Sequence, residues 1–476
     1  MRAHRSSALF PFLTNSLPLV AITLALGCNP PAATDDAAVL PDTGPAPIDA
    51  GHDAFVRADA GPLPLCSGTG CELVGIELMS ESTCVVRGNG QVDCWGRAQE
   101  GELGDTVHSH GANCRMNAGE NDTDCSPRAV TVAFTSAPSA IFTRGTVQGC
   151  GLLGAGHEAW CWGSQHYKLG STLEHSRFAP EHVMVDGVAV ADGATQIALS
   201  FGNLCWIAAD TSVQCLGGGS SGRLGNGAFS DTTTPSPVML AGGTPLMGAL
   251  EIDLQSGHAC ARTADHLYCW GNNQFDQIGS AGPHQTCIAT PTMYDCSNVA
   301  VEVTGVTAST ITDIQLGDVF SCVLHDTGHV QCWGGGQGGG LGTGDLHATV
   351  LPVEPMGLSN VAELRVVDGD ACALLHDGSV MCWGAANQGQ IGDGRMAHAA
   401  TPCLDENGAP YDCQLTPTML PGLSGVAHIG VGEGHACALL TSGQVWCWGE
   451  SVRYQLGDQM RPTPQYAPVR VTALGS

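Results

Sequence analysis

The tripeptide Cys-Trp-Gly recurs along this chain of 476 residues and constrains its fold more than any other feature. Successive copies lie 50 to 67 residues apart, at or above the period of β-propeller blades. A repeat of this length indicates one supersecondary unit per copy, stacked against its neighbours. Six copies begin at Cys94, Cys161, Cys269, Cys332, Cys382 and Cys447, and a seventh, degenerate copy reads Cys215-Leu216-Gly217.

Each unit has the same internal order of short runs separated by Gly and Asp turns. In the sixth unit the runs are Val361–Val366, Ala371–Leu375, Ser379–Gly384 and, after an insert, Pro417–Pro421. Their alternating or β-branched character predicts four strands per unit. No long helical period runs between residues 66 and 476, so we expect an all-β fold.

The consensus of these units carries a family resemblance. It reads Gly-x-x-His-x-Cys-Ala-Leu, a turn, Gly-x-Val-x-Cys-Trp-Gly and then Gly-x-Leu-Gly, best preserved at 434–449 with 455–457 and at 257–271 with 277–279. This pattern resembles the regulator-of-chromosome-condensation repeat. The resemblance implies a seven-bladed β-propeller over about residues 74 to 473. Leu216 departs from the pattern, although Trp206 can refill the missing volume.

The chain has 23 cysteines, an odd number, and all but Cys28 fall into local pairs. Hairpin loops of two to four residues would place the paired cysteines of each unit opposite each other, within disulfide range. Free thiols and metal ligands are the alternatives, but zinc-type spacing is absent, and we expect no metal or cofactor. Seven pairs flank the central hairpins (Cys84/Cys94, Cys150/Cys161, Cys205/Cys215, Cys260/Cys269, Cys322/Cys332, Cys372/Cys382, Cys437/Cys447), three lie in inserts (Cys114/Cys125, Cys287/Cys296, Cys403/Cys413), and Cys66/Cys71 precedes the first unit.

The N-terminus has the layout of a secretory signal. Arg2 and Arg5 precede the mostly apolar stretch 9–26. The following Ala25-Leu26-Gly27-Cys28 resembles the lipobox of bacterial lipoproteins, apart from Ala25 where Leu is usual. We therefore expect a signal peptide over 1–27 and lipid on Cys28, with plain secretion and a retained anchor as alternatives. Residues 28–65, rich in Pro, Ala and Asp, predict a disordered tether, and 66–476 the propeller.

The charge balance limits the partners. The formal net charge is −28, with 17 Lys and Arg residues, which disfavours nucleic acid and anionic lipid surfaces. We expect contact with the membrane through the lipid anchor alone. An electrostatically guided partner should be basic or should bring a divalent cation. A monomer is expected.

The inserts are the predicted binding surface. They follow the Gly-x-Leu-Gly segment of blades one, four and six, so they should project from one rim as three disulfide-pinned prongs. The alternative is that they are tolerated surface insertions. Acidic residues at 120–124 and 405–408, with Asp412, could bind calcium, although solvated loop acids explain them equally well.

No nucleophile elbow, zincin motif, phosphate loop or isolated carboxylate dyad is present in the sequence, so we expect no enzyme activity. A related family, the plant ultraviolet-B photoreceptor, uses clustered Trp for light sensing, but here each Trp is more simply a blade-packing residue. His258 and His435 resemble the family's structural histidine.

The sequence therefore predicts a surface-anchored protein in the cell envelope that binds another macromolecule, either a protein or a glycan. One alternative is an inhibitor of an extracellular enzyme, as in the β-lactamase-inhibitory propeller that the fold resembles. The other is guanine-nucleotide exchange by family analogy. The signal peptide, the disulfides and the negative charge argue against exchange, because its partners are cytosolic or anionic.

Overall fold

The computed structural model describes residues 23–24, 56–57, 71–110, 112–114, 124–136, 138–143, 148–164, 176–200, 202–282, 284–289, 292–398, 402–404, 409–458 and 463–474. Within these ranges no helix is both long enough and apolar enough to cross a membrane. The two helical segments are single 3-10 turns, η1 (Ser220–Gly222) and η2 (Ala308–Thr310).

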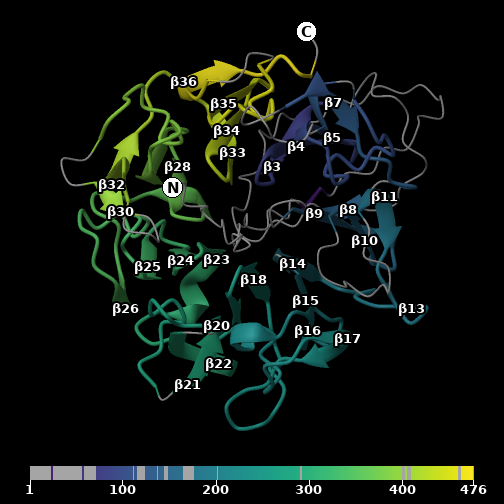
Figure 1. Cartoon of the computed structure of the whole chain (residues 1–476), viewed down its shortest axis with the longest axis vertical. Helices are drawn as coiled ribbons and strands as arrows, with labels where there is room; N and C mark the ends of the chain where they lie inside the picture. Colours follow the sequence, from purple (N-terminus) through teal and green to yellow (C-terminus); the bar gives the residue numbers. More distant parts are fainter. Residues whose placement is uncertain are drawn as a thin grey trace, which may run out of the picture.

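Seven antiparallel sheets form a ring, which confirms the predicted all-β, seven-bladed propeller (Figure 1). Each blade is one continuous stretch of chain, and its first strand lies nearest the axis. Blade one contains β3 (Leu73–Leu78), β4 (Ser82–Arg87), β5 (Val92–Arg97), β6 (Ala112–Asn113) and β7 (Asp124–Thr131); blade two β8 (Pro138–Thr143), β9 (Gln148–Leu153), β10 (Glu158–Gly163) and β11 (Arg177–His182); and blade three β14 (Gln196–Ser200), β15 (Asn203–Ile207), β16 (Val213–Gly217) and β17 (Thr232–Pro237).

The remaining blades follow the same order. Blade four contains β18 (Glu251–Gln255), β19 (His258–Arg262), β20 (Leu267–Asn272), β21 (Gln285–Ala289) and β22 (Thr292–Glu302); blade five β23 (Ile311–Leu316), β24 (Phe320–His325), β25 (Val330–Gly334) and β26 (Thr349–Val353); blade six β27 (Val361–Val367), β28 (Asp370–Leu375), β29 (Val380–Ala385) and β32 (Cys413–Met419); blade seven β33 (Val426–Gly432), β34 (His435–Leu440), β35 (Val445–Gly449) and β36 (Gln465–Arg470). Three strand pairs stand apart: β1 (Thr23–Leu24) with β2 (Val56–Arg57), β12 (Met184–Val185) with β13 (Val188–Ala189), and β30 (Cys403–Leu404) with β31 (Pro410–Tyr411).

The central hairpins have the register that their loop lengths predict. Cys372 lies opposite Cys382, for example, because residues 376–378 form a three-residue loop between Leu375 and Ser379, where the N–H of Leu375 donates to the carbonyl of Ser379. All seven hairpin pairs are disulfides with Cα atoms 4.0–4.1 Å apart.

The insert disulfides differ from the hairpin disulfides in register. Cys125 lies opposite Ala112, two residues before its disulfide partner, and Cys296 lies opposite Gln285, again two residues before its partner. The two bonded cysteines of each of these inserts are therefore not directly opposite each other, as they are in the hairpins. Their disulfide runs diagonally between the strands. Their Cα separations of 6.1 Å and 5.9 Å remain within disulfide range. The three bonded insert pairs are Cys114/Cys125, Cys287/Cys296 and Cys403/Cys413.

The cysteine pair before the first blade is described only in part. Cys71 is disulfide-bonded, and its carbonyl accepts a hydrogen bond from Arg87 Nη1 at 3.0 Å. The partner predicted for Cys71, Cys66, lies outside the described residues, as does the predicted lipidation site Cys28. The Cys66/Cys71 pairing and the lipid on Cys28 therefore stay predictions.

The motif tryptophans join adjacent blades. Trp448 is fully buried, and its indole N–H donates to the carbonyl of Gln390 in blade six at 2.9 Å. Gly392 lies against that indole with a φ of +74°, and a Cβ there would come within 2.5 Å of the ring, so glycine is required. The same bond recurs in five other blades, from Trp95 to Gln455, Trp162 to Glu102, Trp270 to Arg223, Trp333 to Gln277 and Trp383 to Gly340.

The structural role predicted for the two histidines is confirmed. His435 Nε2 lies 3.1 Å from the Thr83 hydroxyl of blade one, which donates to the Gln455 carbonyl that also accepts from Trp95. Burial lowers the pKa of His435 to about 4, so this ring is neutral. His258 makes the equivalent contact with Ser321 of blade five. The ring therefore closes between blades seven and one through the same seam contacts that join blades four and five.

Candidate binding face

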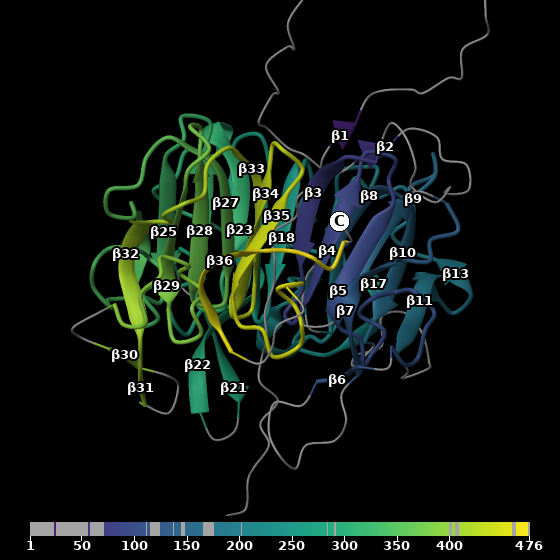
Figure 2. The ribbon, with the colours of Figure 1, turned by 90° about the horizontal axis from the view of Figure 1, so that it is seen from above.

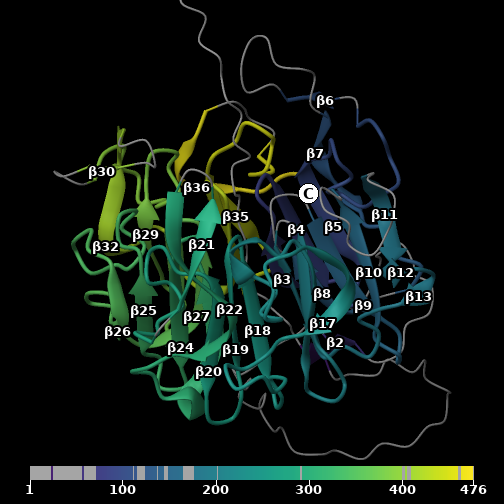
Figure 3. The same ribbon diagram turned by 60° about the horizontal axis from the view of Figure 1, so that its bottom comes forward.

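The three prongs lie on one face of the propeller, as predicted (Figures 2 and 3). In blade four, β21 and β22 extend past the blade as a hairpin, and in blade six β30 and β31 form a short hairpin of their own. In blade one, β6 pairs with the start of β7. The prong tips, at 115–123, 290–291 and 405–408, lie outside the described residues. Most of the acidic residues considered for calcium therefore also lie outside them.

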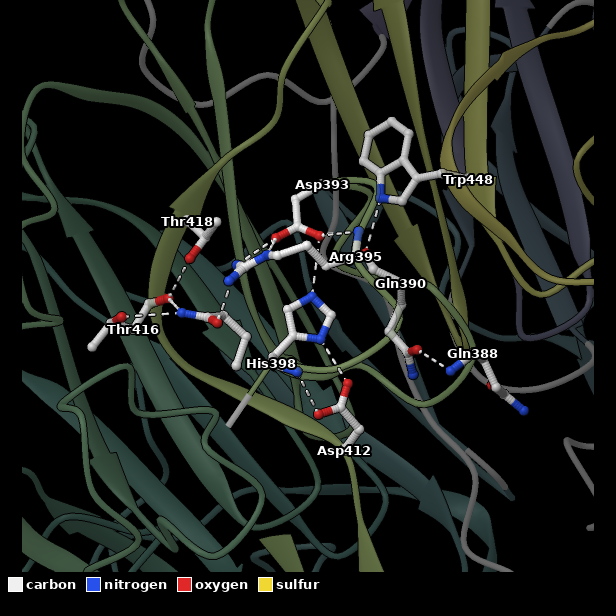
Figure 4. Close-up of polar contacts among 10 residues, drawn as sticks. Gln388, Gln390, Asp393, Arg395, His398, Asp412, Thr416, Thr418 and Trp448 are labelled. Atoms are coloured by element: carbon white, nitrogen blue, oxygen red, sulfur yellow. Dashed lines mark hydrogen bonds and ion pairs between the residues drawn. The ribbon is translucent and has the colours of Figure 1, made fainter. Parts of the chain in front are cut away.

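A histidine held between two aspartates fastens the prong of blade six (Figure 4). His398 Nδ1 lies 2.6 Å from Asp412 Oδ2, and Nε2 lies 3.1 Å from Asp393 Oδ1. The backbone N–H of His398 also donates to Asp412 Oδ1 at 2.9 Å. We call this arrangement the histidine clip. Both ring nitrogens face carboxylates, so neither is open to a metal.

Blade one contains the same clip. His110 Nδ1 lies 2.6 Å from Asp124 Oδ2, and Nε2 lies 3.0 Å from Asp105 Oδ2. The hydrogen bond with Asp105 is the main reason that the pKa of His110 rises to about 9, since burial opposes the rise and Asp124 adds to it. This histidine is therefore charged at neutral pH. Asp124 and Asp412, which sequence reasoning placed in possible calcium loops, hold the clips instead.

Blade four contains half of the clip. His284 Nδ1 lies 2.7 Å from Asp295 Oδ2, but Ser280 replaces the second aspartate. Among the described residues, the buried Nε2 of His284 has no hydrogen-bond partner. Sequence reasoning missed the clip. Its signal was a histidine before the first insert cysteine and an aspartate directly before the second, present in all three inserts.

Each prong also exposes a large apolar side chain at its base or near its tip. Met396 and Val107 lie shortly before the clip histidines, and Met293 lies beside the tip of the blade-four hairpin. Their exposed fractions are 75%, 41% and 69%, respectively. Apolar side chains held in water on rigid supports are typical of protein-binding surfaces.

The mouth of the central channel on this face is acidic. Strands β3, β23, β27 and β33 each lead into a turn that carries a partly exposed carboxylate: Glu81, Asp318, Asp368 and Glu433. These turns lie at the prong end of the blades, because each prong leaves the third strand at the end where the first strand turns back. We call these four residues the acid arc.

Burial and mutual repulsion raise the pKa values at this mouth. Burial is the largest cause for Glu433, whose pKa rises to about 7. Asp368 has a pKa well above its ordinary value because burial is reinforced by Asp318 and Glu433. The pKa of Asp318 is also raised by burial. Asp370, next to the arc, has a pKa of about 8 for the same main reason.

Two arginines approach the arc on the side of blade one. Arg97 contacts Glu81 at 3.0 Å and Glu102 at 3.0 Å. Arg453 contacts Glu81 at 3.3 Å and donates to the carbonyl of Cys114 at the base of the first prong. Both cations are therefore engaged at Glu81, away from Asp318 and Asp368. The described residues contain no cluster of three or more His, Cys, Asp or Glu arranged to hold a metal ion.

Comparison with known proteins identifies the repeat. The family model described as the regulator of chromosome condensation (RCC1) repeat matches residues 426–455. Yeast RCC1 (Prp20), solved with Kap60, has the same fold, with a TM-score of 0.63 at 15% identity over 92% of this chain and 91% of that one. The blades are RCC1-type repeats.

Other proteins with related sequence or structure differ in size. The human E3 ubiquitin-protein ligase HERC2 is 24% identical over 384 residues, which are 78% of this chain and 7% of that protein. The ultraviolet-B receptor UVR8 of Arabidopsis thaliana is 23% identical over 270 residues, 56% of this chain and 54% of the receptor. Human WBSCR16 has a TM-score of 0.59 at 17% identity, covering 80% of this RCC1-type chain and 94% of that structure. The chain thus spans about half the length of the ultraviolet-B receptor and a much smaller part of the ubiquitin ligase.

Proposed function

We propose that this RCC1-type propeller is an exported, lipid-anchored binding protein whose prong face recognises another protein. The observation that carries the proposal is the prong face itself, where three disulfide-bonded inserts surround an acidic mouth and hold Val107, Met293 and Met396 in water. Such exposed aliphatic and thioether side chains favour a protein partner over a glycan. The ten cysteine pairs at bonding distance among the described residues are compatible with an oxidising compartment outside the cytosol.

The direction of the first strand supports presentation of this face to a partner. The chain enters blade one beside the β4–β5 hairpin, where the N–H of Gly88 donates to the carbonyl of Glu72 at 2.9 Å. That hairpin turn lies at the end of the blade opposite the prongs. A tether attached through Cys28 would therefore reach the propeller from behind and leave the prong face directed outward.

The anchor is tested by the variant Cys28→Ser. Removal of the lipidated thiol should move the protein from the membrane fraction to the released fraction, because the described propeller offers no membrane-spanning helix. Cell fractionation and immunoblotting measure this. A variant that still sediments with membranes would contradict lipid anchoring.

Recognition is tested with the released Cys28→Ser chain as bait against exported proteins. The triple variant V107S/M293S/M396S should weaken capture of its partner at least about tenfold, since each truncated anchor of an interface typically costs about 1 kcal/mol or more. The matched control L250S/L351S/M356S removes three apolar side chains of similar exposure that lie outside the prongs. Equal loss of binding in both variants would contradict the assignment of the prong face.

A further inference from the structure

The acid arc is linked by polar contacts that cross blade boundaries. Asp318 Oδ1 accepts from Gln255 Nε2 at 2.6 Å and from the Ser256 hydroxyl at 2.8 Å, both in blade four. The backbone N–H of Asp318 donates to the carbonyl of Asp368 at 3.1 Å, and the two carboxyl groups are hydrogen-bonded to each other. Glu433 accepts from the hydroxyl of Ser80 in blade one. The arc therefore extends from blade five to blade one around the mouth, and blade four donates to it through Gln255 and Ser256.

This region has more hydrogen-bond acceptors than donors. Two carboxyl groups can meet, as Asp318 and Asp368 do, only when a proton lies between them. Among the described residues, Gln255 Oε1 has no hydrogen-bond partner although its side chain is 1% exposed and its amide contacts the arc. Asp370 Oδ1 is likewise unpartnered, and Asp370 is 5% exposed. A buried acceptor without a donor is destabilising, so a donor from outside would be stabilised here.

The shape of the acceptor set indicates what kind of donor fits. Its oxygens are distributed over consecutive turns, and no three acidic or histidine groups converge as metal ligands in the described part. A guanidinium presents five N–H donors in a flat fork and remains charged when partly desolvated. The arginines that the structure places near this mouth are already engaged: Arg97 and Arg453 bind Glu81, and Arg223 donates to the carbonyl of Ser256 at 3.1 Å.

We infer that the acid arc is a socket for an arginine side chain of the protein that the prong face binds. This inference rests on the proposed function and specifies the chemistry of the partner. A guanidinium between Asp318, Asp368 and Glu433 would replace the proton that now joins the two aspartates. The inserted arginine would hold the partner over the channel axis, while the prongs contact the surface of the partner around that arginine.

Proton displacement gives the socket a recognisable signature. The acids that face Asp318 and Asp368 are Glu433 and Asp370, and burial and repulsion raise the pKa of each toward or above neutrality. Below about pH 6 these groups are protonated and attract a cation weakly. A bound guanidinium therefore has to release protons, and its affinity should rise between about pH 5.5 and pH 8.

The test uses tetra-arginine amide and its neutral analogue tetra-citrulline amide as probes of the full-length Cys28→Ser chain, by isothermal titration calorimetry. Tetra-arginine should bind more tightly at pH 8 than at pH 5.5 and should release protons, measured as a heat that depends on the ionisation enthalpy of the buffer. Tetra-citrulline should not bind. Equal affinity at the two pH values, or no proton release, would overturn the socket.

A matched pair of variants in blade six separates the socket from the general negative charge of the protein. Asp368→Asn should weaken tetra-arginine binding at pH 8 by about tenfold, because it removes the central ionisable group and replaces one acceptor oxygen with an NH2 donor. Asp377→Asn removes the same charge from the exposed hairpin turn at the opposite face and should change affinity less than about twofold. Equal weakening by the two variants would mean non-specific attraction and would overturn the inference.

The prong variant V107S/M293S/M396S distinguishes this inference from the proposed function. It should retain tetra-arginine binding while it loses the protein partner. If prong-dependent capture succeeds but the peptide does not bind, the socket alone is wrong. If the peptide binds as expected but capture does not depend on the prongs, the socket holds as an arginine site and the proposed prong function is wrong.

Discussion

Full reduction of the disulfides is expected to lower the melting temperature far more than the loss of any single pair. Each hairpin disulfide closes a loop with a sequence separation of 9 to 11 residues. Such a loop contributes at most about 2.7 kcal/mol in the loop-entropy model, so the double variant C372A/C382A should remain folded. Loss of the seven hairpin and three insert disulfides of the described residues, together with the bond at Cys71, should unfold the protein at ordinary temperature. Differential scanning calorimetry with and without reductant measures both effects.

Blade three provides the sharpest internal comparison for this prediction. Its Cys-Leu-Gly motif places Leu216 where other blades have the Trp that donates across the blade boundary. Removal of Cys205/Cys215 should therefore lower the melting temperature more than removal of Cys322/Cys332, whose blade keeps Trp333. Equal effects would show that the indole bonds do not compensate for a lost disulfide. An unchanged melting temperature after complete reduction would contradict the account of the hairpins.

The protein is expected to be more stable near pH 5.5 than at pH 8. Asp370 has a folded-state pKa of about 8, and Glu433, Glu450 and Glu102 have values of about 7, in each case mainly through burial. These groups titrate near about 4 when unfolded. Between about pH 4 and pH 8 the folded state therefore holds more protons than the unfolded state. The stability that these groups contribute is greatest below about pH 4 and falls as the pH rises through about 7 to 8.

Two histidines modify this profile in opposite directions. The raised pKa of His110, about 9, adds stability that is present below its unfolded pKa of about 6.5 and is lost as pH rises through 9. The lowered pKa of His435, about 4, costs stability as pH falls from 6.5 toward 4. Because four raised carboxyl groups outweigh the one lowered histidine, the stability that these groups contribute should fall from about pH 4 to pH 8.

Thermal melts across pH measure this profile. We expect a melting temperature at least about 5 °C higher at pH 5.5 than at pH 8, as a few kcal/mol would produce in a chain of this size. Asp370→Asn should raise the value at pH 8 and flatten the dependence, because an amide does not need to lose its charge on burial. A protein that is more stable at pH 8 than at pH 5.5 would contradict the assignment of these buried carboxyl groups as protonated.

The sequence could predict most features that lie within one repeat. Cys372 and Cys382 face each other because a local loop sets their register, and the inserts share a face because they occupy the same connection in each blade. The histidine clips could also be predicted in principle, since His398 and Asp412 belong to a single insert. The spacing of the insert cysteines does not itself indicate these contacts.

The acid arc could not be predicted in the same way. Asp318, Asp368 and Glu433 lie 50 and 65 residues apart in succession, and in the sequence each is an ordinary carboxylate in a turn. Only closure of the ring brings the turns together and places the carboxyl groups of Asp318 and Asp368 in contact at a half-buried position. The indole bonds, such as that from Trp448 to Gln390, were hidden for the same reason, since donor and acceptor belong to different blades.

The central claim is that the prong face holds the partner, and site-specific photo-cross-linking in the anchored protein tests it most directly. A photoreactive amino acid at Met293 or Met396 should produce a cross-linked partner, and the same residue at Asp377, exposed on the opposite face, should not. Mass spectrometry of the product should place an arginine of the partner near the cross-link. Capture from Asp377 with none from either prong position would contradict the account.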